Sequence, residues 1–308
     1  MVDLITILGP TASGKTNLAC QLAQIIQGEI ISADSRQIYT GMDIGTGKDI
    51  EEYSLSGNKI PYHLIDIREP GYKYNIWEYQ SDFISAYQQI VNNQHIPILC
   101  GGSGLYIETA LRGNSYTGIE SNTDLRNELS SLSKSEITTR WESISDELKA
   151  KLNNNTLART IRAIEIDEFI KNNSGWEAPI YPTINYTIFG IDIEREKRRS
   201  RITQRLSDRL NHGLIEEVVH LVEKGLAYQD LDYYGLEYRW VGQYLQSKIT
   251  KKELFEGLNI AIHQFSKRQM TWFRRMEKQG YQIIWLDEAE PIDIKLNIML
   301  THLSQNNS

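Results

Sequence analysis

The sequence predicts an α/β protein with a P-loop parallel sheet core covered by helices and an inserted all-helical subdomain. Short apolar segments alternate with segments of helical spacing through residues 4–100, as in parallel sheets whose strands are joined by helices. A glycine-rich octapeptide, GPTASGKT at residues 9–16, connects the first such strand to the first such helix. Residues 118–183 are polar, rich in Ser and Asn and poor in strand character, which predicts a separate helical segment.

The predicted strands are short runs rich in β-branched residues, and helical segments lie between the first four of them. These strands are expected to run parallel, because a parallel pair needs a crossover connection that a helix can supply. The strands are expected at residues 4–8, 28–32, 62–67, 96–100, 186–193 and 281–287, with covering helices at 15–27 and 76–92.

The polar segment contains three helical stretches, and the last of them begins with residue types that cap helices. Beyond it, strand character returns and is followed by a tail rich in helices. These patterns divide the chain into a catalytic core with a helical tail, residues 1–117 and 184–308, and an inserted subdomain, residues 118–183. The expected helices are Asp124 to Leu132, Ser135 to Ile144 and Thr156 to Ile170, the last capped by Asn155 or Thr156, and in the tail 194–212, 214–224, 235–246 and 251–278.

The composition is that of a globular chain with a sizeable core. Its 308 residues are 40% hydrophobic and carry a formal net charge of −7, which argues against binding nucleic acid through overall charge. An apolar run of about 18 residues and a secretory leader are both absent from the sequence, so we expect a cytoplasmic, monomeric protein with no membrane partner. Cys20 and Cys100 are expected to be buried thiols, because two cysteines are too few for a disulfide framework or a zinc cluster.

The octapeptide matches the phosphate-binding pattern G-x-x-x-x-G-K-[ST]. Gly9 and Gly14 allow the backbone to wrap around an anion at a helix amino terminus, Lys15 reaches terminal phosphate oxygens, and Thr16 is expected to ligate Mg²⁺. The motif indicates a bound diphosphate or triphosphate without saying what carries it. The expected diphosphate-binding residues are Gly9, Pro10, Thr11, Ala12, Ser13, Gly14, Lys15 and Thr16.

Asp34 follows the second predicted strand, within SADSRQIYTGMDIGTGK. Ligands of open α/β sheets bind at the carboxyl ends of the strands, so an aspartate there fits a Mg²⁺ ligand or a general base. A helix cap formed by Asp34 or Ser35 is the structural alternative. The guanine-reading pattern N-K-x-D is not met, because Pro61 stands where the aspartate belongs, but a small-molecule kinase remains open.

Seven motifs in this order resemble those of the tRNA dimethylallyltransferases, the isopentenylpyrophosphate transferases that act on adenosine 37. They are GPTASGKT, DSRQIYTGMDIGTGK, YHLIDI, GGSGLY, RTIRAIE, HGLIEEV and FSKRQMTWF, and they span nearly the whole chain. The resemblance implies transfer of a five-carbon allylic group from dimethylallyl diphosphate to N6 of an adenine in the anticodon loop, with release of pyrophosphate. The P-loop would then hold the leaving group, with Mg²⁺ on Thr16.

The resemblance also assigns roles to residues outside the loop. Asp34 matches the family's general base, and Ser103 matches a threonine that hydrogen-bonds near the adenine and the leaving group. With Lys15, these are the expected catalytic residues. The expected partner is the anticodon stem-loop with adenosines 36 and 37, and the expected tRNA-binding residues are Asp34, Ser35, Arg36, Gln37, Ser103, Arg126, Arg159, Arg162, Lys267, Arg268, Gln269, Trp272 and Phe273.

The sequence departs from the family pattern at several positions. Glu237 replaces a glycine and adds negative charge where RNA is expected, and Ile262 and His263 replace a threonine and a basic residue. The basic run REKRRSR at 195–201 fits a solvated helix face and an RNA contact equally well.

Three other functions are compatible with parts of the sequence. A P-loop kinase of a nucleoside or small metabolite would consume ATP and would leave KRQMTWF without a role. A diverged RNA-binding paralogue without activity is suggested by Glu237, but Lys15, Thr16, Asp34 and the Ser103 hydroxyl are retained. A transferase acting on free adenine nucleotides fits less well, because the inserted subdomain and the basic tail favour a large acceptor.

Overall fold

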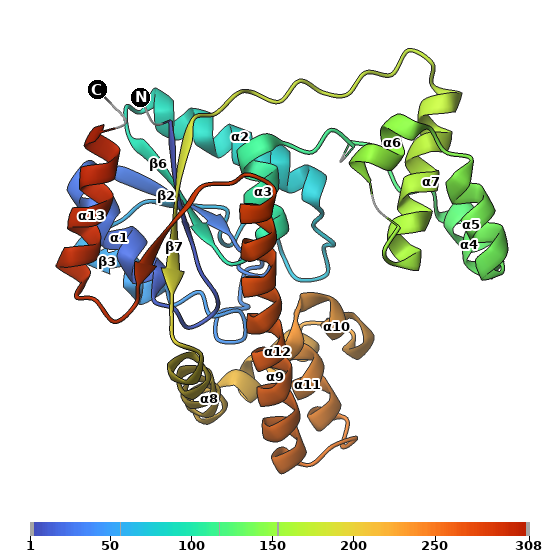
Figure 1. The fold of residues 1–308 in the computed structure, drawn as a ribbon. Coiled ribbons are helices and arrows are strands. Elements are labelled where there is room, and N and C mark those ends of the chain that lie inside the picture. Colours follow the sequence, from blue (N-terminus) through green and yellow to red (C-terminus); the bar gives the residue numbers. More distant parts are fainter. Residues whose placement is uncertain (1–2, 56, 117, 153, 306–308) are drawn as a thin grey trace. The chain divides into compact units, whose positions relative to one another are not determined.

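The computed structural model describes residues 3–55, 57–116, 118–152 and 154–305. Its described strands form a six-stranded sheet of order β5-β2-β6-β1-β7-β8, in which every neighbouring pair is parallel (Figure 1). The α/β class predicted from the sequence is confirmed. The strands are β1 (Leu4–Leu8), β2 (Gly28–Ala33), β5 (Tyr62–His63), β6 (Ile96–Gly101), β7 (Tyr186–Asp192) and β8 (Ile283–Asp287).

The predicted strand at 62–67 is wrong in its length. Only Tyr62 and His63 pair with β2. Leu64 and Asp66 have positive φ angles of 61° and 56°, which no extended strand contains, so the backbone leaves the sheet there.

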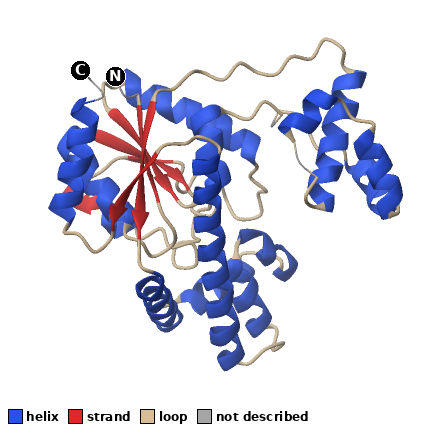
Figure 2. Ribbon diagram, in the orientation of Figure 1, coloured by secondary structure: helices blue, strands red, loops and turns tan. Residues whose placement is uncertain are grey.

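Helices cover both faces of the sheet, as Figure 2 shows with helices in blue and strands in red. One face carries α1 (Lys15–Ile26) and α13 (Ile292–Gln305), and the other carries α2 (Ile76–Asn92) and α3 (Gly104–Arg112) (Figure 1). Under α1 the apolar side chains of helix and sheet form one core, which includes Leu18, Leu22, Ile98, Phe189 and Met299. The sequence did not predict α3 and α13.

A second group of helices follows β7 directly, at the edge of the sheet where the parallel strands end (Figure 1). The carboxyl ends of the strands therefore face the helical tail. The elements of this group are α8 (Arg195–Asn211), α9 (Leu214–Glu223), the 3₁₀ turn η2 (Tyr228–Asp230), α10 (Leu231–Tyr234), α11 (Leu236–Leu245) and α12 (Lys251–Lys278), while the loop after β2 carries the 3₁₀ turn η1 (Ile50–Tyr53) and the hairpin β3 (Ser54–Leu55) and β4 (Asn58–Lys59).

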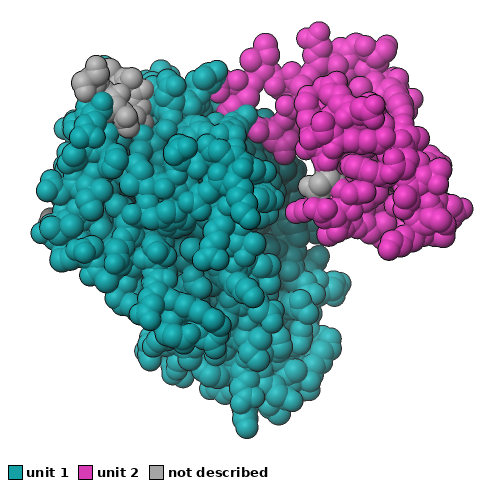
Figure 3. Space-filling view, viewed as in Figure 1, with its two compact units in different colours: residues 1–112, 183–308 teal, residues 113–182 magenta. Residues whose placement is uncertain are grey.

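The chain divides into two compact units, shown in Figure 3. Unit 1 comprises Met1–Arg112 and Thr183–Ser308, and unit 2 comprises Gly113–Pro182. The sequence predicted the first boundary at 117, a residue outside those described. Within the described ranges, none of the helices is long and apolar enough to cross a membrane.

Unit 2 is all helical and has a core of its own, with Leu129, Trp141 and Ile164 among its buried side chains. Each of its helices begins at a polar residue whose side chain accepts a hydrogen bond from the first turn, which satisfies an amide that has no partner within the helix. The helices and their caps are α4 (Thr123–Ser131) with Asn122, α5 (Lys134–Glu142) with Ser133, α6 (Asp146–Lys151) with Ser145 and α7 (Leu157–Asn172) with Thr156.

Two phenylalanines on α12 differ sharply in burial and provide a test of this packing. Phe273 is fully buried, whereas 38% of Phe265 is exposed. We expect Phe273→Ala to lower the free energy of unfolding by about 3–5 kcal/mol, because it leaves a cavity in the core. Phe265→Ala, the matched control, should cost about 1 kcal/mol or less. Urea denaturation followed by circular dichroism measures both, and equal losses would contradict the packing described.

Candidate active site

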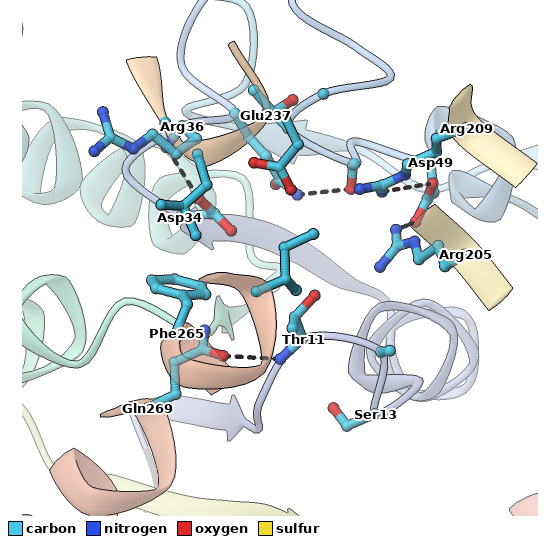
Figure 4. A pocket seen from close by; sticks show the side chains of 18 of the residues that line it. Thr11, Ser13, Asp34, Arg36, Asp49, Arg205, Arg209, Glu237, Phe265 and Gln269 are labelled. Atoms are coloured by element: carbon cyan, nitrogen blue, oxygen red, sulfur yellow. Dashed lines mark hydrogen bonds and ion pairs between the residues drawn. The ribbon is translucent and has the colours of Figure 1, made fainter. Parts of the chain in front are cut away.

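A cavity of about 730 Å³ opens at the carboxyl edge of the sheet, entirely within unit 1 (Figure 4). Three parts of the chain line it: the P-loop after β1, the segment after β2, and the helices of the tail. Asp34 and the P-loop therefore share one cavity, as the sequence led us to expect. The principal lining residues are Thr11 to Thr16, Asp34, Arg36, Gln37, Gly45 to Gly47, Asp49, Arg201, Arg205, Arg209, Glu237, Ile262, Phe265, Arg268 and Gln269.

The P-loop has the backbone of an anion site. Ala12 and Gly14 have positive φ angles of 62° and 80°, which turn the chain into α1 at Lys15. Within the part of the chain that the structure describes, no side chain caps this helix, so its first amide groups have no capping acceptor there. The Ser13 hydroxyl is also buried and has no partner among the described residues. Donors of this kind at a helix amino terminus bind phosphate oxygens.

Gln269 of α12 links this loop to the connection that follows β6. Its Oε1 accepts a hydrogen bond from the Thr11 amide at 2.9 Å, and its Nε2 donates to the Gly102 carbonyl at 3.0 Å. A Cβ atom at Gly102 would lie 2.4 Å from that Nε2, so only glycine permits the contact. The Gln269 amide is largely buried and bonded at both ends, but the residue also lines the cavity, so its contact with tRNA stays a prediction.

Asp34 and Ser103 lie side by side at the ends of two neighbouring strands. Asp34 Oδ1 accepts a hydrogen bond from the Arg36 amide at 2.9 Å, and Ser103 Oγ accepts one from the Ser35 amide at 3.2 Å. The turn that Asp34 stabilises is therefore the one that carries the predicted adenosine contacts. Asp34 also lines the cavity, so its hydrogen bond within the turn is compatible with the predicted chemical role.

Arg36 and Gln37 are both bonded within the protein. The Arg36 guanidinium donates to the Tyr233 carbonyl and lies 5.9 Å from the centre of the Tyr233 ring. Gln37 accepts from the Ser32 hydroxyl at 3.0 Å and donates to the Gly47 carbonyl at 3.2 Å. Both side chains still line the cavity, so their contact with a substrate stays a prediction.

Three arginines of α8 also line the cavity, and the sequence reasoning missed their position. Arg201, Arg205 and Arg209 recur every four residues, which places them on one helix face. That spacing predicts the shared face but not that the face lines a cavity, and the run at 195–201, which includes Arg201, was expected to be either a solvated face or an RNA contact. Arg205 pairs with Asp49, and Arg209 Nη2 lies 3.9 Å from Asp49 Oδ1 (Figure 4).

Burial shifts two ionisable groups in this part of the cavity. It lowers the pKa of the Arg209 guanidinium below its usual value, and the neighbouring Arg205 charge lowers it further. Burial raises the pKa of the Glu237 carboxyl above its usual value, against the opposing effect of Arg209. Glu237 lines the cavity, where the charges of Arg209 and Arg205 act on it (Figure 4).

The predicted RNA-binding stretch of α12 presents only part of its residues to solvent. Lys267 and Arg268 are exposed. Trp272 is half-buried, packing against Gly104 and under the Arg275 guanidinium, which lies 4.0 Å from the ring centroid. Phe273 is fully buried, so the prediction that it contacts tRNA is corrected: its ring belongs to the core.

The predicted arginines of unit 2 also separate into two kinds. Arg126 binds the buried Glu165 carboxylate with both ends of its guanidinium, at 3.0 and 2.9 Å. Arg162 donates to the same carboxylate and to the carbonyls of Tyr116 and Ile119. Burial alone would raise the pKa of the Glu165 carboxyl, but the hydrogen bonds from both arginines hold it below its usual value.

Arg126 and Arg162 therefore stabilise unit 2 itself. Arg159, one turn before Arg162, is exposed on α7. Of the three arginines, Arg159 is the most exposed.

Comparisons with known proteins agree with this geometry. The family model described as IPP transferase matches residues 37–276, and a second, Isopentenyl transferase, matches residues 2–69. The chain is 50% identical over 303 residues to a protein of Bacteroides fragilis named tRNA dimethylallyltransferase 2, covering 98% of each chain. It is 49% identical over 305 residues to a protein of the same name from Phocaeicola vulgatus, covering 99% of each.

Solved structures give the same result. The full-length tRNA isopentenylpyrophosphate transferase of Bacillus halodurans superimposes with a TM-score of 0.71 at 30% identity, covering 98% of this chain and 95% of that one. A eukaryotic dimethylallyltransferase acting on tRNA shares the fold, with a TM-score of 0.75 at 22% identity over 93% of this chain and 74% of that chain. The resemblance seen in the seven motifs is confirmed, and the chain belongs to the IPP transferase family.

Proposed function

We propose that this protein transfers the dimethylallyl group of dimethylallyl diphosphate to N6 of adenosine 37 in the anticodon loop of tRNA, releasing pyrophosphate. The supporting observation is that the P-loop and Asp34 line one cavity, in a chain about half identical to proteins named tRNA dimethylallyltransferase. Family membership leaves the kinase alternative without support. We expect the enzyme to act as a monomer in the cytoplasm.

The P-loop side of the cavity would stabilise the leaving group. As the bond between C1 and the bridging oxygen breaks, the electron pair goes to the diphosphate, and negative charge builds on its oxygens. Lys15, the uncapped amides of α1 and the buried Ser13 hydroxyl supply positive charge and hydrogen-bond donors there. Such prearranged donors stabilise a developing anion without reorganising during the reaction.

The Asp34 side of the cavity would activate the acceptor. The exocyclic amine of adenine is a poor nucleophile, so its proton must be taken as the new bond between N6 and C1 forms. The Asp34 carboxylate is a suitable base because the Arg36 amide fixes one of its oxygens and the side chain lines the cavity. Ser103, which accepts a hydrogen bond from the Ser35 amide, keeps this turn in register with the end of β6.

Mg²⁺ is the expected cofactor, with Thr16 as its protein ligand. Among the described residues, no group of three or more His, Cys, Asp or Glu is arranged to hold a metal ion. Thr16 lines the cavity next to Lys15, and Mg²⁺ at a phosphate site is usually held by one or two protein groups together with substrate phosphates and water. When bound there, it would neutralise charge on the diphosphate.

The acceptor must leave its base stack to reach Asp34, because a stacked adenosine keeps N6 out of reach of a pocket. The exposed cations Arg159, Lys267 and Arg268 fit contacts with the phosphates of the anticodon stem-loop. Arg268 also lines the cavity, so it stands where the strand carrying adenosines 36 and 37 would enter.

Asp34→Asn tests the general base. We expect the single-turnover rate to fall about 100-fold to 10,000-fold, because the amide cannot accept the proton of N6. Binding of tRNA should change less than about twofold, since the side chain keeps its shape. The product is measured by digesting the tRNA and weighing its nucleosides. Asp208→Asn, a carboxylate lining the same cavity, is the control and should retain activity. Unchanged prenylation in Asp34→Asn would exclude the proposed base.

Lys15→Met tests the leaving-group site. We expect kcat/KM for dimethylallyl diphosphate to fall about 100-fold to 1,000-fold, because one cation that stabilises the departing diphosphate is lost. The dissociation constant for tRNA should stay the same, as measured by filter binding. Lys59→Met, on the exposed hairpin, is the matched control. A weakened affinity for tRNA with normal use of the donor would contradict this role.

Lys267→Ala and Arg159→Ala test the proposed phosphate contacts. Each substitution should weaken tRNA binding and reduce the slope of log K against log salt concentration by about 1, as expected for the loss of one phosphate contact. Binding measured between low and physiological salt gives the slope. If both slopes equal that of the wild type, these cations do not contact the RNA.

A further inference from the structure

The loop at residues 43–49 forms one wall of the cavity and is held from behind by a single carboxylate. Glu217 of α9 accepts hydrogen bonds from the amides of Asp43, Ile44 and Gly45, at 2.8, 2.7 and 3.0 Å. It also accepts one from the Tyr238 hydroxyl, at 2.8 Å. Glu217 is not among the residues that line the cavity, so it acts on the far side of the wall.

These contacts are specific to a carboxylate. Three successive amides that point to one place form a concave site for an anion, and here an acid from the protein itself fills it. Each bond from an amide to a carboxylate is charge-assisted, and therefore stronger than a bond between neutral groups. A neutral amide side chain would keep the shape but lose the charge and turn an NH₂ group toward the donors.

The helix that carries Tyr238 is fitted to the same loop. Tyr238 is fully buried, and a Cβ atom added at Gly45 would lie 2.6 Å from its Cζ atom. The loop therefore approaches the tyrosine ring as closely as a glycine allows. The Glu217 carboxylate, through its hydrogen bond, and the Tyr238 ring, through its close contact, therefore both restrict the position of Gly45.

A buried lysine holds the other end of the loop. Lys48 has no exposed side-chain surface, and its Nζ donates to the Tyr39 carbonyl and to Asp43 Oδ1, both at 2.6 Å, and to Asp66. Between the two anchors, the carbonyl of Gly47 accepts the hydrogen bond of Gln37 Nε2. The loop thus holds one end of the side-chain amide of Gln37, three residues after Asp34, while Ser32 holds the other end.

We propose that Glu217 is a positioning residue for the acceptor half of the reaction. Its carboxylate fixes the loop at residues 43–49, which supports Gln37, and so aligns the target adenosine with Asp34. This inference rests on the proposed function. The donor half is held separately, since Gln269 of α12 binds the P-loop. Loss of Glu217 is therefore expected to affect the two substrates unequally.

Glu217→Gln tests the proposal, with kinetics measured well below the unfolding temperature of each variant. We expect kcat/KM for tRNA to fall about 10-fold to 100-fold, because small misplacements of a bound reactant cost rates of that order. The KM for dimethylallyl diphosphate should change less than about twofold, since the P-loop is untouched. Glu216→Gln, on the neighbouring exposed acid, is the matched control, and Tyr238→Phe, which removes one donor of four, should have a smaller effect.

Hydrogen exchange supplies a readout that needs no activity. The amides of Asp43, Ile44 and Gly45 should exchange faster in Glu217→Gln than in Glu216→Gln. Equal exchange, or a parallel change in KM for both substrates, would overturn the proposal. If the wild type binds tRNA without prenylating it, the proposed function and the acceptor role fail together, while faster exchange would still establish the anchor itself.

Discussion

The amide of Gln269 ties the P-loop and the tail helix α12, two of the parts that line the cavity, to the connection after β6. One end bonds to the P-loop after β1, the other to the connection after β6, and the residue itself belongs to α12 of the tail. These segments are far apart in sequence, so no local preference brings them together. The contact requires glycine at Gly102, and the same helix packs Trp272 where a side chain on Gly104 would clash. The glycines of GGSGLY thus let α12 close over the ends of the strands.

A cavity closed in this way concentrates opposite charges in little space. Lys15 and the α8 arginines face it together with Asp34, Asp49 and Glu237. Two groups in it differ in kind: Lys15 and the uncapped amides of α1 lie at the P-loop, while Asp34 follows the end of β2. Separated groups of this kind suit a reaction in which one reactant leaves as an anion and the other loses a proton. Neighbouring charges and burial, more than residue type, decide what each group can do.

Much of this site was predictable from the sequence, because its signals are local. A strand, a glycine loop and a helix that follow one another place Lys15 at a helix amino terminus, and the end of β2 places Asp34 near it. The roles of Arg126, Arg162 and Phe273 were not predictable in this way. A charged or aromatic residue in a motif looks the same whether it faces a ligand or its own protein, and only the packing of distant segments separates the two. The short β5 and the position of the arginines on α8 depended on tertiary structure in the same sense.

Glu237 shows how such packing changes the meaning of a departure from a family pattern. As a residue of the sequence, it adds negative charge on a surface expected to meet RNA. In the structure it lies within the cavity, where the charges of Arg205 and Arg209 act on it and burial raises its pKa. Burying a carboxylate without cations nearby would be costly, and burying Arg209 without an acid would be equally so. Each charge acts on the pKa of the other residue against the effect of burial without cancelling it, so the departure from the family pattern is one of cavity electrostatics.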